Sequence, residues 1–401
     1  MWNIKWHAGK NPWLNYRSNG VHKGRHTRRR TECTLCHSRV RYICRSRDRK
    51  EKTRYEVKMS STISTLHTYD TEYSADSVEW CPHTPTQHLF VCGTYQLDKE
   101  DQVRTARKGR VLLFSYRKAT NSLALEQTIE TAAVLDQKWH PASPVLAIVN
   151  ASGQIMTYNL SPDGDKLIPT HTLTIQKEGG EEQLALSIDW TTRGDIAAVS
   201  DSKGGLSIVD FDERGLHQRL RVKAHSFEAW TCAFDRTDEH IIYTGGDDTL
   251  LNIYDIRCFD VPVMKNKCHD AGVTSLLSMR HKENLLATGS YDDHLRIFDR
   301  RSMKSPISRT NLGGGVWRLK PNPHRPDSIL CACMYHNFSV VNLNEDHSIT
   351  VESEYFEHDS ICYGCDWSYA SDNSERDYYF ASCSFYDHKL CLAKMNCDNK
   401  E

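Results

Sequence analysis

The chain has 401 residues, a formal net charge of −1, 39% hydrophobic and 26% charged residues, and a mean hydropathy of −0.61. These values indicate a soluble protein with enough apolar residues for a large core, in one large domain or two ordinary ones. No stretch approaches the roughly 18 apolar residues of a membrane span, which excludes a membrane protein. No apolar segment follows the first basic residues, so we expect no secretory signal. The 15 cysteines are scattered through strand-like segments, which favours free thiols and a cytoplasmic location.

Charge is unevenly distributed along the chain. Residues 1–58 hold 17 of the 51 Lys and Arg residues and 4 of the 52 Asp and Glu residues, which leaves 34 basic against 48 acidic residues in the remainder. With few aliphatic residues and no periodicity, residues 1–58 are predicted to be a basic, disordered tail. The alternatives are a nucleic-acid-binding arm, a mitochondrial presequence, a start codon placed too early with Met59 as the initiator, or a zinc site from Cys33, Cys36, His37 and Cys44. We favour the tail or the early start and predict no nucleic-acid partner.

From Met59 onward one phrase recurs: an alternating apolar segment, often closing on Trp-x-Pro, then a small-residue segment, a turn and a second alternating segment. Seven copies span Val78–Tyr116, Val134–Leu160, Leu184–Phe211, His225–Arg257, His269–Arg301, Val316–Leu343 and His358–Met395. Residues 59–395 give about 48 residues per copy, close to the length of WD-type propeller blades. We therefore predict an all-β, seven-bladed WD-repeat β-propeller over 59–395 and a C-terminal tail at 396–401. Residues 61–73 should supply the outer strand of the last blade and close the ring.

Some recurring residues have a structural explanation. The first His of a copy is predicted to hydrogen-bond the Asp of the turn, because a buried carboxylate needs a partner. The predicted pairs are His225 with Asp248, His269 with Asp292 and His358 with Asp387. The Trp that closes the first segment is predicted to be core at Trp80, Trp139, Trp190 and Trp367.

Aromatic residues recur at two further phases of the repeat, and both phases should face the mouth of the ring. The first phase precedes the structural Asp and holds Tyr95, Tyr291, Tyr335 and Tyr386. The second phase lies early in the first strand and holds Asp76, Leu135, Leu186, Trp230, Thr274, Trp317 and Tyr363. The acidic neighbours are Asp76, Glu228, Asp247 and Asp293. Such a rim suits a cationic ligand held by cation–π contacts, or alternatively an ordinary protein-binding face.

Two histidines outside the structural pairs are candidate catalytic residues. His294 and His388 lie beside carboxylates such as Asp293, so either could act as a general base near neutral pH, although a solvated rim residue is the simpler interpretation. No Gly-x-Ser-x-Gly elbow, phosphate loop or metal-protease motif is present. We predict no metal and no cofactor.

Several phrases together resemble one family. They are "YDTEYSADSVEWCP", "FVCGTYQL", "AHSFEAW", "YTGGDD", "ATGSYDDH", "GGGVWRLK", "YGCDWS" and "ASCSFYDH", and from Leu66 to Leu392 the chain resembles the diphthine methyl esterases, WD-repeat proteins of diphthamide biosynthesis. Pro321 departs from the family, which has Trp there. The resemblance implies hydrolysis of the methyl ester of methylated diphthine on elongation factor two, which yields diphthine for the final amidation step. The elongation factor would be the partner, with other proteins of that pathway as further partners and no membrane.

The implied substrate carries a trimethylammonium group and a methyl ester, which agrees with the aromatic and acidic rim. The family supplies no nucleophile motif to transfer, so the simplest mechanism is attack by water assisted by His294, His388 or Asp293. The predicted substrate-binding residues are Trp230, Trp317, Tyr291, Tyr386, Tyr95, Tyr335, Tyr363, Asp76 and Glu228.

The competing function is a WD-repeat adaptor without catalysis, such as a substrate receptor of a cullin ubiquitin ligase. "YDIR" (Tyr254–Arg257) and "FDRR" (Phe298–Arg301) are copies of the aromatic-Asp-x-Arg ending that such receptors use. The plainer interpretation of this ending is that Asp-x-Arg ties adjacent strands together.

Overall fold

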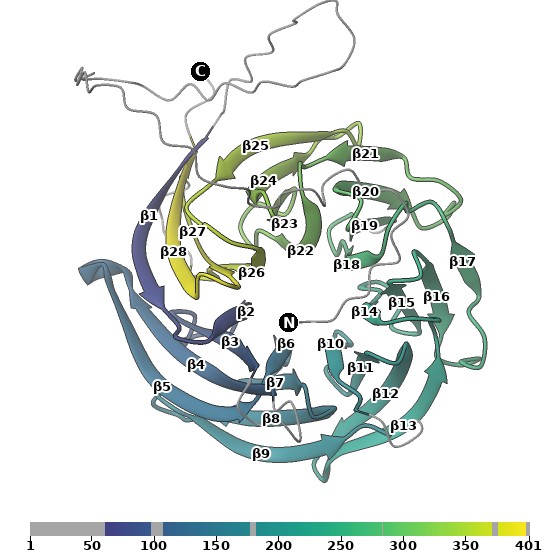
Figure 1. Cartoon of the computed structure of the whole chain (residues 1–401), viewed down its shortest axis with the longest axis horizontal. Helices are drawn as coiled ribbons and strands as arrows, with labels where there is room; N and C mark the ends of the chain where they lie inside the picture. Colours follow the sequence, from purple (N-terminus) through teal and green to yellow (C-terminus); the bar gives the residue numbers. More distant parts are fainter. Residues whose placement is uncertain (1–60, 98–106, 177–181, 283, 371–375, 398–401) are drawn as a thin grey trace, which may run out of the picture. The chain divides into compact units, whose positions relative to one another are not determined.

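The protein is described here by a computed structural model that covers residues 61–97, 107–176, 182–282, 284–370 and 376–397. These residues form seven four-stranded antiparallel sheets, arranged as blades around a central axis (Figure 1). The predicted seven-bladed, all-β propeller is thus confirmed. Residues 1–58, with the candidate zinc ligands, lie outside the described residues. Among the described residues, no helix is long and apolar enough to cross a membrane.

In six of the seven blades the four strands follow one another in chain order from the axis outward (Figure 1). Blades 1 to 3 are β2 (Ser74–Trp80), β3 (Leu89–Leu97), β4 (Arg107–Arg117), β5 (Ser122–Ala132); β6 (Val134–Trp139), β7 (Val145–Asn150), β8 (Gln154–Leu160), β9 (Leu167–Thr174); and β10 (Ala185–Trp190), β11 (Ile196–Asp201), β12 (Gly205–Asp212), β13 (Gly215–Lys223). Blades 4 to 6 are β14 (Ala229–Phe234), β15 (Ile241–Gly246), β16 (Leu251–Asp255), β17 (Met264–Asn266); β18 (Val273–Ser278), β19 (Leu285–Ser290), β20 (His294–Asp299), β21 (Ser308–Asn311); and β22 (Gly315–Pro321), β23 (Ser328–Met334), β24 (Asn337–Leu343), β25 (Ile349–Tyr355). A short 3₁₀ turn, η1 (Lys118–Thr120), joins β4 to β5.

The last blade is completed by the start of the propeller. It consists of β26 (Cys362–Trp367), β27 (Asp377–Ser384), β28 (Lys389–Cys397) and, outermost, β1 (Ser61–Asp70). The β1 strand pairs antiparallel with β28, from Ser61 opposite Cys397 to Asp70 opposite Lys389. The predicted closing strand is therefore confirmed, and the pairing removes the open edges that an unclosed ring would present.

The burial pattern explains which strands the sequence revealed. Inner strands such as β2 and β10 are buried along their whole length, whereas the outer strand β5 alternates between exposed and half-buried residues. The predicted copies cover the inner three strands of each blade, and the weakly apolar fourth strand lies between copies. The predicted core indoles Trp80, Trp139, Trp190 and Trp367 are all buried, as expected.

The predicted His–Asp pairs form three different arrangements, of which one matches the prediction. In blade 4, His225 Nδ1 donates to Asp248 at 2.8 Å. In blade 7 a hydroxyl intervenes: His358 Nδ1 hydrogen-bonds Ser384 Oγ at 2.6 Å, and Ser384 Oγ donates to Asp387 at 2.5 Å.

In blade 5 the direct pair of His269 with Asp292 is wrong. The buried Arg296 is the partner of Asp292 instead: its Nη1 donates to one carboxylate oxygen at 2.8 Å, and its Nη2 forms an ion pair with the other at 2.7 Å. His269 instead contacts Thr288 Oγ1 through Nε2 at 2.9 Å and the Cys268 sulfur through Nδ1 at 3.8 Å. Arg296 lies four residues after Asp292, on the third strand, where the geometry of the turn brings it back to the carboxylate. Asp292 is thus a structural residue, but with a different partner.

The cysteines of the described residues are free thiols, and most of them are buried in the strands. Burial raises the pKa of thiols such as Cys81 and Cys391, which keeps them in the unreactive protonated form. These cysteines therefore behave as small apolar core residues, as the sequence predicted.

Candidate functional site

Every innermost strand carries a β-bulge near its beginning, and the bulges build the site. The pairing register between first and second strands shifts at this point in all seven blades. The residues skipped by the shift are Asp76, Leu135, Leu186, Trp230, Thr274, Trp317 and, with Gly364, Tyr363. This set, which we call the upper ring, is the second aromatic phase found in the sequence. A bulge re-aims a side chain, so the common bulge explains why these residues share one role.

The large side chains of the upper ring contact each other edge to face and face to face. The Trp317 ring centroid lies 5.7 Å from that of Trp230, 5.8 Å from that of Tyr291 and 5.0 Å from that of Tyr363, the last nearly parallel at 25°. Trp230 also meets Tyr291 edge-on at 6.1 Å. These spacings are those of stabilising aromatic pairs.

The aromatic contacts continue into blades 7 and 1 through Phe385. Its ring lies 5.1 Å from Tyr363, 5.7 Å from Tyr95 and 5.0 Å from Tyr386. The rings from Trp230 to Tyr95 form one continuous set, which we call the aromatic array. The sequence prediction missed Phe385, although it stands beside Tyr386 in "SFYD".

The four tyrosines of the first aromatic phase divide into two kinds. Tyr95 is 4% exposed and Tyr291 is half-buried within the array, whereas Tyr335 and Tyr386 are 80% and 66% exposed. Burial raises the pKa values of Tyr95 and Tyr291, so both phenols stay neutral. Tyr335 and Tyr386 instead present apolar surface to solvent beside the array.

Polar groups contact the array from two sides. The Trp230 indole N–H donates to Asp247 at 3.0 Å, and the Asp247 backbone N–H donates to the Glu228 carbonyl at 2.9 Å. The Tyr95 hydroxyl accepts from Arg107 Nε at 3.0 Å, and Arg107 also pairs with Glu182.

Trp317 differs from Trp230 in its polar atom. Its indole N–H is buried, and no residue in the described part of the chain accepts a hydrogen bond from it. A buried donor without an acceptor costs roughly 1–3 kcal/mol, so such a group calls for an explanation.

The candidate catalytic residues lie where the second strand turns into the third: Asp293 and His388 in the turns, and His294 at the start of β20. His294 Nδ1 lies 2.6 Å from the Asp292 carbonyl oxygen, and His388 accepts at its own carbonyl from Thr71. Burial raises the pKa of the Asp293 carboxyl, and the charge of Asp292 raises it further. Among the described residues, neither imidazole makes a ring contact with the aromatic array. A catalytic role for His294, His388 or Asp293 stays a prediction.

The two Asp-x-Arg endings form local turns. Arg257 donates from its backbone N–H and Nε to Asp255, at 2.9 and 2.8 Å, and Arg301 does the same with Asp299 at 2.9 and 3.0 Å. The ion pairs stay within one turn, and both guanidinium groups are largely exposed.

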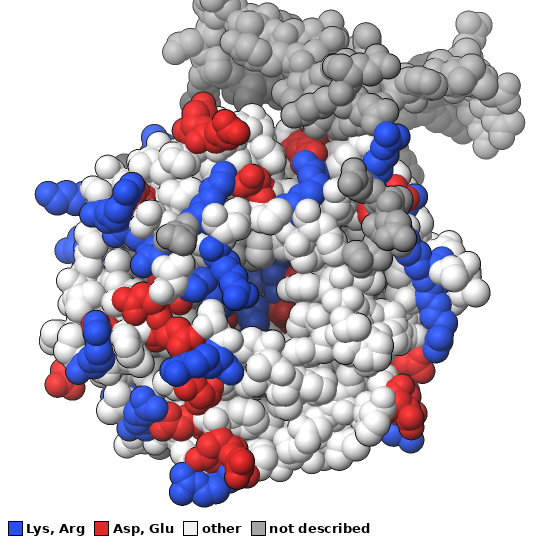
Figure 2. Space-filling model, turned by 180° about the vertical axis from the view of Figure 1, so that it is seen from behind, with Lys and Arg blue, Asp and Glu red and all other residues white. Residues whose placement is uncertain are grey.

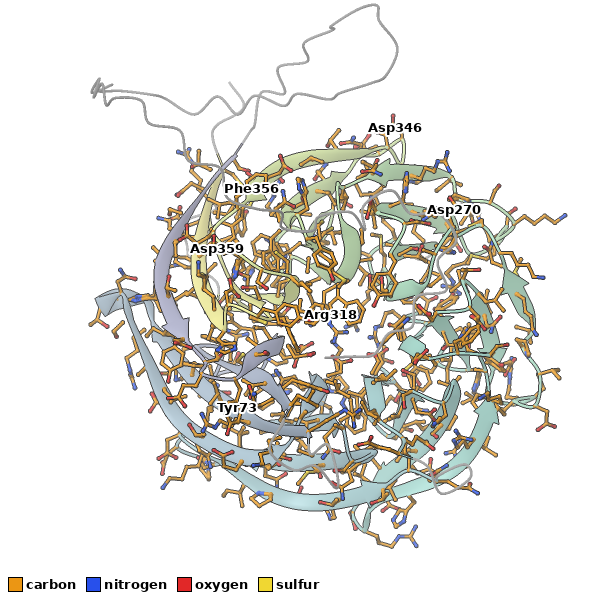
Figure 3. The ribbon with its side chains drawn as sticks, viewed as in Figure 1. Tyr73, Asp270, Arg318, Asp346, Phe356 and Asp359 are labelled. Carbon is orange, nitrogen blue, oxygen red and sulfur yellow. The ribbon has the colours of Figure 1, made fainter. Side chains whose placement is uncertain are left out.

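Toward the ends of the inner strands, the axis is lined by ion pairs. Glu79 pairs with Lys138 and Lys320, Asp136 with Arg318 at 3.2 Å, and Asp189 with Arg236 at 2.7 Å. These groups, with Asp366, line a cavity of about 650 Å³, which we call the lower cavity. Seen from behind, side chains of both signs lie deep in the central hollow (Figure 2), and Arg318 lies beside the axis (Figure 3).

Comparison with known proteins supports both the fold and the family. The WD domain, G-beta repeat family matches residues 260–299. A diphthine methyltransferase of Mus musculus is 38% identical over 77% of this chain and 70% of its own. A diphthine methyltransferase homolog of Dictyostelium discoideum is 34% identical and a diphthine methyltransferase of Schizosaccharomyces pombe is 32% identical, each over 80% of this chain and 96% of its own. A chain in the crystal structure of a mitotic checkpoint complex shares the fold, with a TM-score of 0.65 at 16% identity over 89% of this chain and 99% of that one.

Proposed function

Since the chain belongs to the diphthine methyltransferase family, we propose that it acts in diphthamide biosynthesis as a carboxyl methyl esterase. Its substrate is the methyl ester of methylated diphthine on elongation factor two, and its products are methanol and diphthine, which the final amidation step consumes. Water is the acceptor, and no cofactor takes part.

The observation that carries this proposal is the aromatic array. A trimethylammonium group is a fixed cation without N–H donors, so ion-pair geometry cannot hold it well, whereas the faces of Trp and Tyr attract it. Trp230, Trp317, Tyr291 and Tyr363 offer such faces at the upper ring. Tyr335 and Tyr386 extend the apolar surface outward, where a macromolecular substrate would approach.

Carboxylates complete the complementarity to a cation. Glu228, Asp247 and Asp76 lie at or beside the array, and residues 59–401 carry the acidic excess of the chain. His294, His388 and Asp293 lie in turns of the blades that supply Tyr291 and Tyr386, and they are the residues predicted to handle the attacking water.

The relatives are named methyltransferases, whereas the proposed reaction is hydrolysis of an ester, and the two reactions break different bonds of the methyl ester. The experiment therefore identifies which bond breaks. The purified chain is incubated with methylated elongation factor two in H₂¹⁸O. Attack by water at the ester carbonyl places one ¹⁸O in the diphthine carboxylate and releases unlabelled methanol. Transfer of the methyl group to another acceptor leaves the carboxylate unlabelled. Stable binding with no loss of the methyl ester would instead support the adaptor.

A further inference from the structure

One carboxylate of the upper ring has no partner among the described residues. Asp76 is 5% exposed, and in the described part of the chain no hydrogen bond or ion pair reaches its carboxylate oxygens. Asp136, in the next blade, accepts from Ser187 Oγ at 3.0 Å, from the Ile188 N–H at 3.1 Å and from Arg318 at 3.2 Å. Buried carboxylates are normally hydrogen-bonded or ion-paired, as Asp136 is, so the unpaired state of Asp76 requires an explanation.

The surroundings of Asp76 compensate its negative charge only in part. The titratable and charged groups that face it from neighbouring strands are Arg318 on β22, Asp136 on β6, Tyr95 on β3, Tyr363 on β26 and Cys383 on β27. Arg318, the cation of this set, is already paired with Asp136. Burial therefore raises the pKa of Asp76 to about 8, with Arg318 lowering it and Asp136 raising it.

We propose that Asp76 is the proton acceptor of this site, and that a quaternary ammonium group bound against the aromatic array brings it into its ionised form. The inference rests on the proposed function and names the base for that reaction. The ligand class is a methyl ester that carries a quaternary ammonium group. A cation there supplies the missing counter-charge of Asp76, so substrate binding itself generates the base.

The proposed hydrolysis then balances in atoms and protons without a cofactor. The Asp76 carboxylate takes a proton from water as the water oxygen bonds to the ester carbonyl carbon, and the carbonyl electron pair moves to its oxygen. When the carbonyl reforms, the bond to the methoxy oxygen breaks, and that oxygen takes the proton from the Asp76 carboxylic acid to leave as methanol. The product acid loses its proton to solvent, and the Asp76 carboxylate is restored.

The linkage between cation and proton can be measured without the ester. Tetramethylammonium is titrated into the full chain at pH 6.5 in buffers of different ionisation enthalpy, with indole fluorescence as a second signal. Wild type should release close to one proton per cation bound, and its affinity should rise by up to about tenfold per pH unit until about pH 8.

Two variants isolate Asp76. Asp76→Asn should release no proton and bind the cation with pH-independent affinity. Asp270→Asn, which removes an exposed carboxylate elsewhere on the propeller (Figure 3), should behave as wild type. Equal proton release from wild type and Asp76→Asn would overturn the inference.

Hydrolysis of the methylated elongation factor provides the second measurement. Asp76→Asn should lower kcat by about 10²- to 10⁴-fold, as loss of a general base does. If wild type releases methanol and Asp76→Asn turns over equally fast, the assignment of Asp76 is overturned and the proposed function stands. If wild type releases no methanol, the proposed function falls, whatever the titration shows.

Discussion

The two ends of the propeller axis treat their carboxylates in opposite ways. Around the lower cavity, Asp136, Asp189 and Asp366 each pair with a basic group and also accept a backbone N–H from the next blade, at Ile188, Phe234 and Trp80 respectively. At the upper ring, Asp76 does neither with any described residue. The same inner strands supply both ends, so the difference separates carboxylates that join blades from the one that we propose as the base.

The largest expected effect comes from breaking a buried pair of the lower cavity. Lys320→Met leaves Asp366 without its cation, and losing one partner of a buried ion pair costs about 3–5 kcal/mol. Burial already raises the pKa of Asp366 to about 6, and loss of Lys320 should raise it further. A folded-state pKa above the unfolded value costs stability as pH rises, so the deficit should grow from pH 5.5 to pH 8. Urea midpoints at the two pH values measure it.

Lys282→Met is the matched control, because Lys282 pairs with the half-exposed Asp327. It should cost less than about 1 kcal/mol. A Lys320→Met variant as stable as this control would show that the lower pairs do not hold the blades together.

The second effect distinguishes the partners of two turn aspartates. Asp292→Ala strands the buried Arg296 guanidinium and should cost about 3–5 kcal/mol. Asp248→Ala removes the acceptor of His225 and of the Ser226 and Leu250 backbone N–H groups but leaves no buried guanidinium unpaired, and it should cost about 1–3 kcal/mol. Thermal melting ranks the two, and the double variant should be about additive because the blades differ. A larger loss of stability for Asp248→Ala than for Asp292→Ala would instead support the predicted pairing of Asp292 with His269.

The third effect has the opposite sign and concerns Asp76. Its folded-state pKa of about 8 lies above the unfolded value near 3.9, so this group lowers stability as pH rises from about 4 to about 8. Asp76→Asn should match wild type near pH 3, where both side chains are neutral, and should become progressively more stable than wild type up to about pH 8, by urea midpoints. A variant less stable than wild type at pH 9 would mean that Asp76 is a tie like Asp366.

The smallest effect is on binding. Trp230→Ala should weaken binding of the trimethylammonium substrate by about 3- to 30-fold, the worth of one cation over an indole, and keep the fold intact. A neutral isostere should bind poorly to wild type and lose little more in the variant. If a histidine rather than Asp76 activates the water, His294→Ala and His388→Ala should lower turnover and spare binding. Equal affinity of wild type for the cation and the isostere would leave the aromatic array as a docking surface only.

The repeat made much of this predictable. Apolar alternation identified the inner strands, and the phase of the repeat grouped Asp76, Trp230, Trp317 and Tyr363 before the bulge that unites them was known. The period also identified the need for a closing strand.

What the repeat could not predict depends on contacts between different phases. Asp292 bonds Arg296 because the turn folds the third strand back onto the carboxylate. Phe385 is buried and the adjacent Tyr386 is exposed, because the backbone of one turn directs the two side chains differently. Two neighbouring aromatic residues in a sequence do not reveal this difference. Within the described residues Asp76 has no partner, because Arg318, on another blade, pairs with Asp136, and no sequence pattern indicates that pairing.

The pairing of β1 with β28 has a consequence for how the protein is made. The ribosome releases β1 first and β28 last, so the first strand waits for its partner through the synthesis of about 320 residues. At 5–20 residues per second, the wait is roughly 15–65 s. Throughout that time a ten-residue strand and an incomplete ring expose unpaired edges, and the circle can form only once β28 has left the ribosome. The β1–β28 pairing thus removes the open edge of the finished ring. It also means that the unpaired strand edges of the nascent chain must be kept from aggregating until β28 has been made.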